Sequence, residues 1–462
     1  MRSANGVYAP SPLATSARAM SPVAWFVIAV LSLSLVALNH DFDVVGGRFE
    51  ETVTSGAQLD LQEEAQSDVM GGTLQRKFGL AGLLAAAGLA LMLPARGTRL
   101  HLGPMAMLVA ALMCWTVASL LWSTEPTRTV HELIRLAAYV ITALILTSRF
   151  SIREIVWSFL VVCVVAIATD VGADVAAGTF RPWTAEFRLG GALHPNHVGR
   201  LGAILAMIGI AVAWERKYRR WAWLPIVAGL AVVLMSVSRS SLLSVAVGIG
   251  AIAFLGMSGR RFAFHLACLV VAFGLGLGFF AVCPPSVQQR LAGTALMGRT
   301  EDASSLTGRW PLWTEMWSDS AGRRLQGHGY GAYWTADRNY DVASVIGWYP
   351  THSHSIYMEL LIDLGLIGLF LCLAIAFLGI MQYSRLVAVT KRFEFRLLGA
   401  LLLCALTNGL LEVNFIWPRL EGLFLGMAVL ALVMKAEAQP HLATNTASSA
   451  GALTYSPTHV LT

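Results

Sequence analysis

Two histidines separated by one serine, His352 and His354, stand where a polar, aromatic loop runs into a long apolar segment. Imidazole has a reference pKa near 6.5, so it can accept or donate a proton close to neutral pH. Glu359 and Asp363 follow His354 at helical spacing, which places two carboxyl groups just inside the apolar segment. This spacing predicts acid-base chemistry at a boundary between water and a hydrophobic phase.

Three arginines lie in polar stretches beside other apolar segments: Arg188 in "FRLGGALHPNHVGRLG", Arg239 in "SVSRSSLLS" and Arg309 in "SLTGRWPLW". Guanidinium groups bind phosphate and carboxylate oxygens through paired hydrogen bonds. Arg309 precedes a short predicted helix, where a cation opposes the helix dipole unless it shares an anion with the free amides. These positions predict an anion site, although Arg239 alone could simply anchor a short hairpin at a membrane surface.

A turn followed by a helix start carries His194, Asn196 and His197 around Pro195. Free backbone amides at such a start would also favour an anion, whereas the alternative is an ordinary loop with interfacial histidines. The spacing of the four histidines also leaves zinc as an alternative, but neither H-E-x-x-H nor a cysteine ligand set accompanies them. We therefore expect neither a metal nor a cofactor.

Tryptophans recur at helical spacing in "RWPLWTEMW", at Trp310, Trp313 and Trp317. The pattern predicts a short amphipathic helix resting on a membrane surface. A plain tryptophan belt would explain these aromatic residues equally well, but it would not explain Arg309.

The composition indicates that the hydrophobic phase beside these residues is a membrane. Of 462 residues, 56% are hydrophobic and 13% are charged, about half the charged fraction of soluble proteins. The net charge is +6, but the Lys and Arg residues are scattered among apolar segments rather than gathered on one face, so we expect no nucleic-acid partner. The sequence predicts an all-α, polytopic transmembrane helix bundle.

Apolar segments near the length that crosses a bilayer recur along the chain, which predicts about 12 spans. They lie near residues 22–38, 78–94, 103–122, 130–148, 153–171, 196–214, 221–237, 240–257, 262–283, 355–381, 396–412 and 419–435. Alternate connections are rich in Lys and Arg, which assigns them to the cytoplasmic side. The histidines and the three arginines then share the external side.

This topology divides the chain into a cytoplasmic disordered tail at 1–21, a transmembrane domain at 22–435 and a second such tail at 436–462. External loops are expected at about 39–77, 172–195 and 284–354. The first apolar segment could instead be a cleaved signal peptide, but "SLVALNHDF" offers no good cleavage site.

The order of the motifs resembles the O-antigen ligase and polymerase superfamily, which includes exopolysaccharide polymerases. The resemblance covers residues 118–369 and rests on "WSTEP", "GALHPNHVG", "SRSSLLS", "TGRWPLW", "GHGYGAYW" and "HSHSIYMELLIDLGLIGL". His354 aligns with the late family histidine better than His352 does, although the choice between them stays open. The family has Asn after that histidine, whereas this chain has Ser355.

The resemblance implies an architecture similar to the large-loop membrane glycosyltransferases, in the bacterial inner membrane with the active site facing the periplasm. It implies a metal-independent enzyme that transfers a saccharide from an undecaprenyl-diphosphate carrier to an acceptor glycan or glycolipid. His354 would be the catalytic base, and Arg188, Arg239 and Arg309 would bind the diphosphate. The supporting residues would be His194, Asn196, His197, His352 and Glu359.

Two other classes of function remain open at this level. A polytopic transporter of glycans or ions would suit the number of spans, and Asp170, Asp174, Glu132 and Arg135 are polar residues within them. A noncatalytic scaffold for polysaccharide assembly is the third alternative. Within the enzyme class, the sequence does not separate a ligase from a polymerase, because the two differ only in the acceptor.

Overall fold

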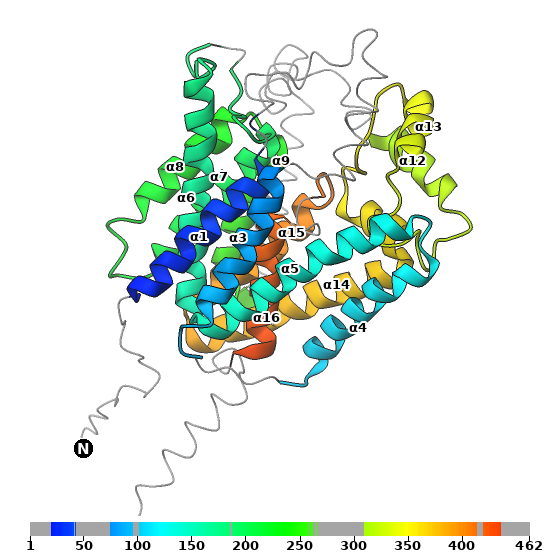
Figure 1. Cartoon of the computed structure of the whole chain (residues 1–462). Helices are drawn as coiled ribbons and strands as arrows, with labels where there is room; N and C mark the ends of the chain where they lie inside the picture. The colour runs from blue at the N-terminus through cyan, green and yellow to red at the C-terminus, as the bar shows by residue number, and fades with distance from the viewer. Residues whose placement is uncertain are drawn as a thin grey trace, which may run out of the picture.

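The computed structural model describes residues 20–40, 42, 74–95, 101–184, 187–257, 259–261, 265, 309–413 and 419–435. These residues form helices joined by turns, with no strand among them (Figure 1). The helices are α1 (Pro22–Asn39), α3 (Leu74–Ala90), α4 (Pro104–Ala118), η3 (Ser119–Trp122), α5 (Pro126–Arg149), α6 (Ile152–Ala176), α7 (Pro195–Val212), α8 (Trp223–Met235), α9 (Arg239–Phe254), α12 (Arg309–Asp319), α13 (Ala336–Ile346), α14 (Ile356–Thr390), α15 (Phe393–Asn408) and α16 (Leu420–Met434).

Local residue chemistry explains where several of these helices begin. Proline occupies the first position of α1, α4, α5 and α7, where its missing N–H costs no helical hydrogen bond. Ser151 and Glu154 form a reciprocal capping box at the start of α6. Thr335 caps α13, and Gly347, with φ at 83°, ends it.

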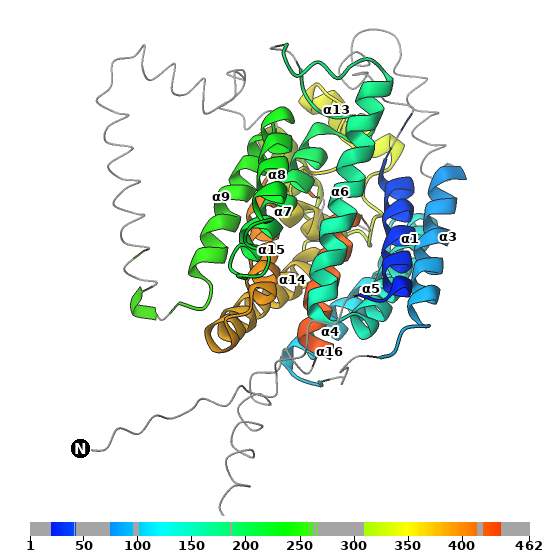
Figure 2. The ribbon, with the colours of Figure 1, turned by 90° about the vertical axis from the view of Figure 1, so that its left-hand side faces the viewer.

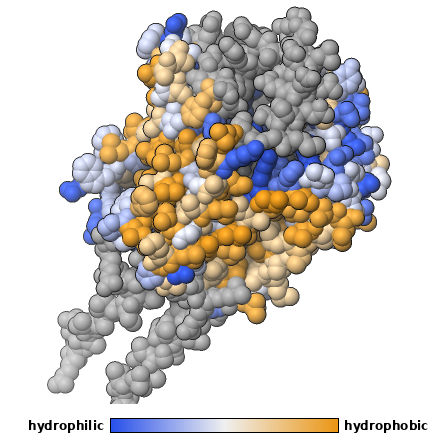
Figure 3. Space-filling model, viewed as in Figure 1, coloured by the Kyte–Doolittle hydropathy of each residue, from blue (hydrophilic) through white to orange (hydrophobic). Residues whose placement is uncertain are grey.

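Six helices are long and apolar enough to cross a membrane, namely α1, α4 with η3, α5, α6, α7 and α14. Figure 3 shows a broad apolar face over the helices, with hydrophilic residues gathered near α12 and α13. The exposed large apolar side chains include Leu102, Leu121 and Phe370, which are 83%, 86% and 69% exposed. Lipid is the solvent that such a surface requires, so the chain is a multi-pass membrane protein.

The predicted total of about 12 spans is not established by these helices. Helices lie over every predicted span except that at 262–283, which falls almost wholly outside the described residues, as do most of the loop at 39–77 and of the two tails. Some of the helices, such as the 13-residue α8, are apolar but short; at 1.5 Å per residue α8 extends about 20 Å. Both the count and the external loops remain predictions.

Helix α7 lies at the centre of the bundle, against α6, α8, α9 and α15 (Figure 2). Of the 18-residue apolar stretch of α7, 83% of the residues are buried inside the protein, whereas the corresponding share for α14 is 28%. Gly202 on α7 meets Gly229 on α8 so closely that a Cβ at Gly202 would lie 2.8 Å from the Gly229 carbonyl oxygen. Such small-residue contacts let membrane helices approach each other.

Helix α14 is kinked at Gly365, whose φ of 69° is in the left-handed region. The bend frees backbone groups, and the segment around Gly327 pairs with them: the His328 amide donates to Ile362 O at 2.7 Å, and the Leu366 amide donates to Arg324 O at 2.8 Å. Non-helical backbone at membrane depth is tolerated where protein satisfies it in this way.

The direction of the helices decides which loops meet. Helices α7, α9 and α14 begin at one end of the bundle, and α15 ends there. Two contacts fix this arrangement: the Ile356 amide donates to Gly409 O at 2.8 Å, and Ser241 Oγ donates to Asn196 O at 3.4 Å. One region is therefore surrounded by five parts of the chain: the first turn of α7, the first turn of α9, helix α12, the loop before α14 and the loop after α15.

Candidate active site

A chain of polar contacts links three of these elements. Arg188 donates from Nη2 to Asn196 Oδ1 at 2.9 Å and from Nε to Ser236 O at 3.0 Å. Asn196 in turn donates from Nδ2 to Glu412 Oε1 at 2.7 Å. Glu412, on the loop after α15, also lies 3.7 Å from Arg309 Nη2. One buried carboxylate is therefore linked to two of the predicted arginines, directly to Arg309 and through Asn196 to Arg188.

The third predicted arginine, Arg239, begins α9 and is close enough for its charge to affect Arg309. Burial lowers the pKa of Arg309, Glu412 opposes that change, and Arg239 adds to it. Arginine stays protonated in proteins, so two cations face one another with Glu412 as a counter-charge. Arg239 makes no hydrogen bond or ion pair within the part of the chain described here. An additional anion would relieve this repulsion.

His354 lies in the same region, half-buried in the loop before α14. Burial lowers the pKa of its imidazole to about 3, with smaller contributions from Arg309 and His194. The ring is therefore neutral at physiological pH, as a general base must be. Its Nδ1 is buried and has no hydrogen-bond partner among the described residues. The backbone there has φ at 53°, an uncommon value for a residue with a side chain.

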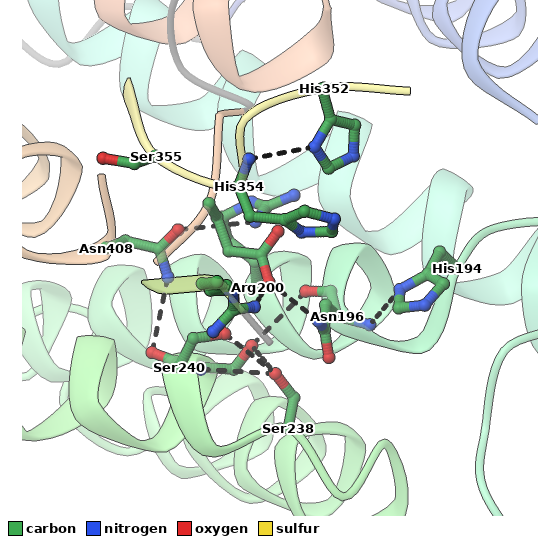
Figure 4. Close-up of polar contacts among 12 residues, drawn as sticks. His194, Asn196, Arg200, Ser238, Ser240, His352, His354, Ser355 and Asn408 are labelled. Atoms are coloured by element: carbon green, nitrogen blue, oxygen red, sulfur yellow. Dashed lines mark hydrogen bonds and ion pairs between the residues drawn. The ribbon is translucent and has the colours of Figure 1, made fainter. Parts of the chain in front are cut away.

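His352 packs against His354 with ring centroids 4.0 Å apart (Figure 4). Its Nδ1 accepts a hydrogen bond from the His354 amide at 3.2 Å. Burial and the neighbouring His354 hold the pKa of His352 well below its usual value. One ring nitrogen of His352 is thus committed to holding the loop, whereas Nδ1 of His354 has no partner among the residues that the structure describes. This difference favours His354 as the reactive ring.

Glu359, in the first turn of α14, stabilises the histidine loop through hydrogen bonds. Its Oε2 accepts from the Ser353 amide at 2.9 Å, and its Oε1 accepts from Trp334 Nε1 at 3.0 Å. Trp313 of α12 donates from Nε1 to Ser353 O at 2.8 Å. The residue between the two histidines is therefore fixed at both its amide and its carbonyl.

The tryptophans of α12 do not share one surface role. Trp310 and Trp317 are 64% and 45% exposed, whereas Trp313 turns inward to make the contact with Ser353. The predicted helix is present, and Trp313 lies on its inner side, where its indole N–H has a partner within the protein. That the helix rests on a membrane surface stays a prediction.

His194 and His197 flank the start of α7, but the amides there are not free. His194 Nδ1 accepts from the Asn196 amide at 3.2 Å, the His197 amide donates to His194 O, and Pro195 has no N–H. The predicted use of these amides for an anion is therefore wrong, because the helix caps itself. His197 Nε2 lies 3.2 Å from Arg419 Nη1.

Glu412 and Arg419 were not identified from the sequence. They flank a short connection between two apolar helices, and charged residues in so short a connection are the signal that could have found them. Behind them, Arg200 is 1% exposed and donates from Nε to Glu421 Oε1 at 2.8 Å. This buried pair joins α7 to α16 beneath the site.

The intramembrane residues that favoured a transporter have local partners. Asp170 Oδ1 accepts from the Ala192 and Leu193 amides at 3.2 and 3.1 Å, and Asp174 Oδ2 accepts from the Gly191 amide at 3.2 Å. These carboxylates hold the loop that carries Arg188 and His194. Glu132 and Arg135 form an ion pair with each other at 2.9 Å.

The arrangement can hold a compact anion and accept a proton beside it. Arg188, Arg239 and Arg309 supply donors, Glu412 marks the space between two of them, and His354 supplies a neutral imidazole. Across the described ranges, no group of three or more His, Cys, Asp and Glu side chains is arranged to hold a metal ion.

Two comparisons with known proteins bear on this site. Residues 224–373, which include Arg239, Arg309, His352, His354 and Glu359, match the family model described as O-Antigen ligase. The chain is also similar to the exopolysaccharide production protein ExoQ of Rhizobium meliloti (strain 1021), with 26% identity over 379 residues, covering 76% of this chain and 82% of that protein. With the order of motifs along the chain, these matches support an assignment to the O-antigen ligase-like superfamily.

Proposed function

We propose that this protein is a glycosyltransferase that moves a saccharide from an undecaprenyl-diphosphate carrier to an acceptor glycan on the periplasmic side of the bacterial inner membrane. The likeness to the O-antigen ligase family model and to ExoQ supports a role in glycosyl transfer at a membrane. The single observation that carries the finer proposal is the convergence of Arg309, Arg239 and the neutral ring of His354 beside Glu412.

The leaving group determines what the arginines do. As the bond between the sugar and the carrier breaks, negative charge builds on the diphosphate oxygens, and fixed cations stabilise that charge. Arg309 and Arg239 would bind the diphosphate directly. Arg188, which Asn196 and Ser236 hold in place, would bind it from the α7 side.

The acceptor determines what the histidine does. A sugar hydroxyl loses its proton as it attacks the anomeric carbon, and the unpartnered Nδ1 of His354 would accept that proton. The new glycosidic bond forms as the bond to the diphosphate oxygen breaks, so the anomeric configuration inverts. The diphosphate leaves with the carrier lipid.

The first test measures glycan transfer by the purified protein from a carrier-linked saccharide. We expect His354→Ala to lower kcat by about 10² to 10⁴, the usual contribution of a general base. Arg309→Ala should lower the rate by about 10² to 10³, as for other preorganised charge-stabilising donors. His131→Ala, an exposed histidine on α5, is the matched control and should be fully active. Wild-type activity in either site variant would remove that residue from the mechanism.

The proposal covers both a polymerase and a ligase, which differ in the acceptor of the saccharide. Deletion of the gene distinguishes them. Loss of long chains with retention of the carrier-linked unit would identify a polymerase. Accumulation of carrier-linked polymer would identify a ligase. Unchanged surface glycans, together with unchanged glycans in the His354→Ala strain, would support a noncatalytic role instead.

A further inference from the structure

A second group of cations surrounds a cavity at the end of the bundle opposite the candidate active site. The cavity has a volume of about 680 Å³, and its lining includes Trp214, Gly256, Arg261, Lys391 and Arg396. Its size is in the range of pockets that hold small molecules. The proposed transfer reaction does not use it.

The course of the helices separates the two sites. Helices α7, α9 and α14 begin at the candidate active site and end beside this cavity, while α15 runs back from it (Figure 2). The 18 residues of α7 extend about 27 Å at 1.5 Å per residue. The cavity therefore faces the other side of the membrane.

Two of the cations have no counter-charge within the described part of the chain. Arg261 and Lys391 are exposed and form no ion pair there. The carboxylates at this end are occupied elsewhere: Glu394 Oε1 accepts from Arg153 Nε at 2.8 Å, and Glu215 lies 3.9 Å from Arg153. The cavity therefore carries positive charge that no nearby carboxylate of the described residues balances.

Arg396 is held at the cavity wall. Its Nη1 donates to Ile252 O at 2.8 Å and Leu255 O at 3.2 Å, which satisfies the end of α9, and its guanidinium lies 5.3 Å from the Trp214 ring centroid. Its Nε is buried and has no hydrogen-bond partner in the part of the chain described. The ends of α9 and α14 each contribute about half a negative charge, which still leaves a surplus of about two positive charges.

The general excess of Lys and Arg on cytoplasmic loops explains part of this charge. It does not explain why three cations converge on a formed cavity. The wall is built tightly: Gly256, with φ at 78°, donates its amide to Ser384 Oγ at 3.4 Å and lies against the end of α14 at Val387.

We propose that this cavity binds the phosphate of an anionic phospholipid headgroup. The surroundings favour a lipid over a soluble phosphate, because Trp214, Trp221 and Trp223 are 52%, 58% and 56% exposed at this end of the bundle. Exposed tryptophans mark the level of the lipid headgroups. This inference does not rest on the proposed transfer reaction.

Lipid binding to the full-length protein in detergent, measured by native mass spectrometry, tests the proposal. The titrants are phosphatidylglycerol and phosphatidylcholine, and glycerol 3-phosphate serves as the soluble competitor. The double variant Arg261→Gln/Lys391→Gln removes two cavity cations, and Arg219→Gln/Arg385→Gln removes two exposed cations outside the lining. We expect the cavity variant to bind phosphatidylglycerol about thirtyfold more weakly, from the attraction of each cation to an anionic lipid, and the control to bind it as the wild type does.

The other outcomes overturn the proposal in distinct ways. Equal weakening in both double variants, or in neither, would show that the cavity has no special affinity. Displacement of the lipid by millimolar glycerol 3-phosphate, lost in the cavity variant, would assign the cavity to a soluble phosphate. If the double variant elutes as an aggregate on gel filtration, Lys391→Gln alone should weaken binding about fivefold, and unchanged binding there would also refute the proposal.

Discussion

At the residue scale, the state of His354 depends on what else occupies the site. Burial and the charge of Arg309 keep the ring neutral, with a pKa of about 3. A pKa this low makes the free ring a weak base, because a general base works best near the operating pH. A bound diphosphate would offset the arginine charge and raise the pKa of His354, so the donor itself would activate the base.

The pH dependence of transfer follows from this coupling. Because protonation of His354 removes the base, the acid limb of kcat/KM, which reports the free enzyme, should lie well below pH 6.5. The acid limb of kcat should lie at higher pH. The Arg309→Gln variant should move the kcat/KM limb upward, since one cation is removed. A kcat/KM limb at pH 6.5 in the wild type would contradict the assigned state of His354.

The same pKa has a consequence for folding. As the pH falls from about 6.5 towards 3, the unfolded chain binds a proton at this histidine while the folded protein does not. The contribution of His354 therefore makes the fold less stable with falling pH across that window.

Glu412 occupies the place where an anionic substrate would compete for Arg309. Glu412→Gln keeps an oxygen that can accept from Asn196 Nδ2 but removes the charge 3.7 Å from Arg309. We expect the KM for the donor to fall several-fold in steady-state assays, because the competing carboxylate is gone. Glu412→Ala, which also removes the acceptor for Asn196, should lower kcat instead. A higher KM in Glu412→Gln would show that the carboxylate is needed to order the arginines.

At the element scale, the kink in α14 places the histidine loop relative to the rest of the helix. Gly365 has φ at 69°, and a Cβ there would overlap the carbonyl of Leu325. The segment that fills the kink continues to Trp334, which holds Glu359, which in turn holds Ser353 between the two histidines. The position of the reactive ring therefore depends on a bend several residues away.

Gly365→Ala tests this dependence. Because the residue would be strained and would clash with backbone, we expect a loss of more than about 1 kcal/mol in stability, seen as a lower Tm of the purified protein. Gly88→Ala is the matched control, since a Cβ on that helical glycine meets nothing within 4 Å. An unchanged Tm in Gly365→Ala would mean that α14 can straighten without cost.

At the scale of the whole molecule, the bundle separates two charged ends by an apolar belt. The proposed active site lies at one end, and the cavity lined by Arg261, Lys391 and Arg396 lies at the other. Uncompensated Lys and Arg mark the cytoplasmic side. The candidate active site therefore faces the periplasm in the proposed orientation.

Labelling of single cysteines checks that orientation. In a variant whose six native cysteines are replaced by serine, Asp337→Cys on α13 should react with a membrane-impermeant maleimide in intact spheroplasts. Arg219→Cys, exposed at the opposite end, should react only after the membrane is opened. The reverse pattern would place the site in the cytoplasm and rule out a periplasmic donor.

The sequence by itself determined the helical class, the approximate positions of the apolar helices and of α12, and the membrane surroundings, because these depend on local hydrophobicity, prolines and caps. It did not predict α13. It also singled out Arg309 and His354, whose residue types stand out beside apolar segments. It could not show that the α7 amides are already occupied, because that depends on the rotamer of His194.

Only the tertiary structure decided which charges meet. Asn196 and Glu412 are 216 positions apart, and nothing local to either residue specifies their contact. It also distinguished His352, whose Nδ1 holds the loop, from His354, whose Nδ1 has no partner in the described chain. Such contacts depend on how α7, α14 and α15 pack and in which direction each helix runs. The geometry of the site therefore forms only when the bundle is assembled.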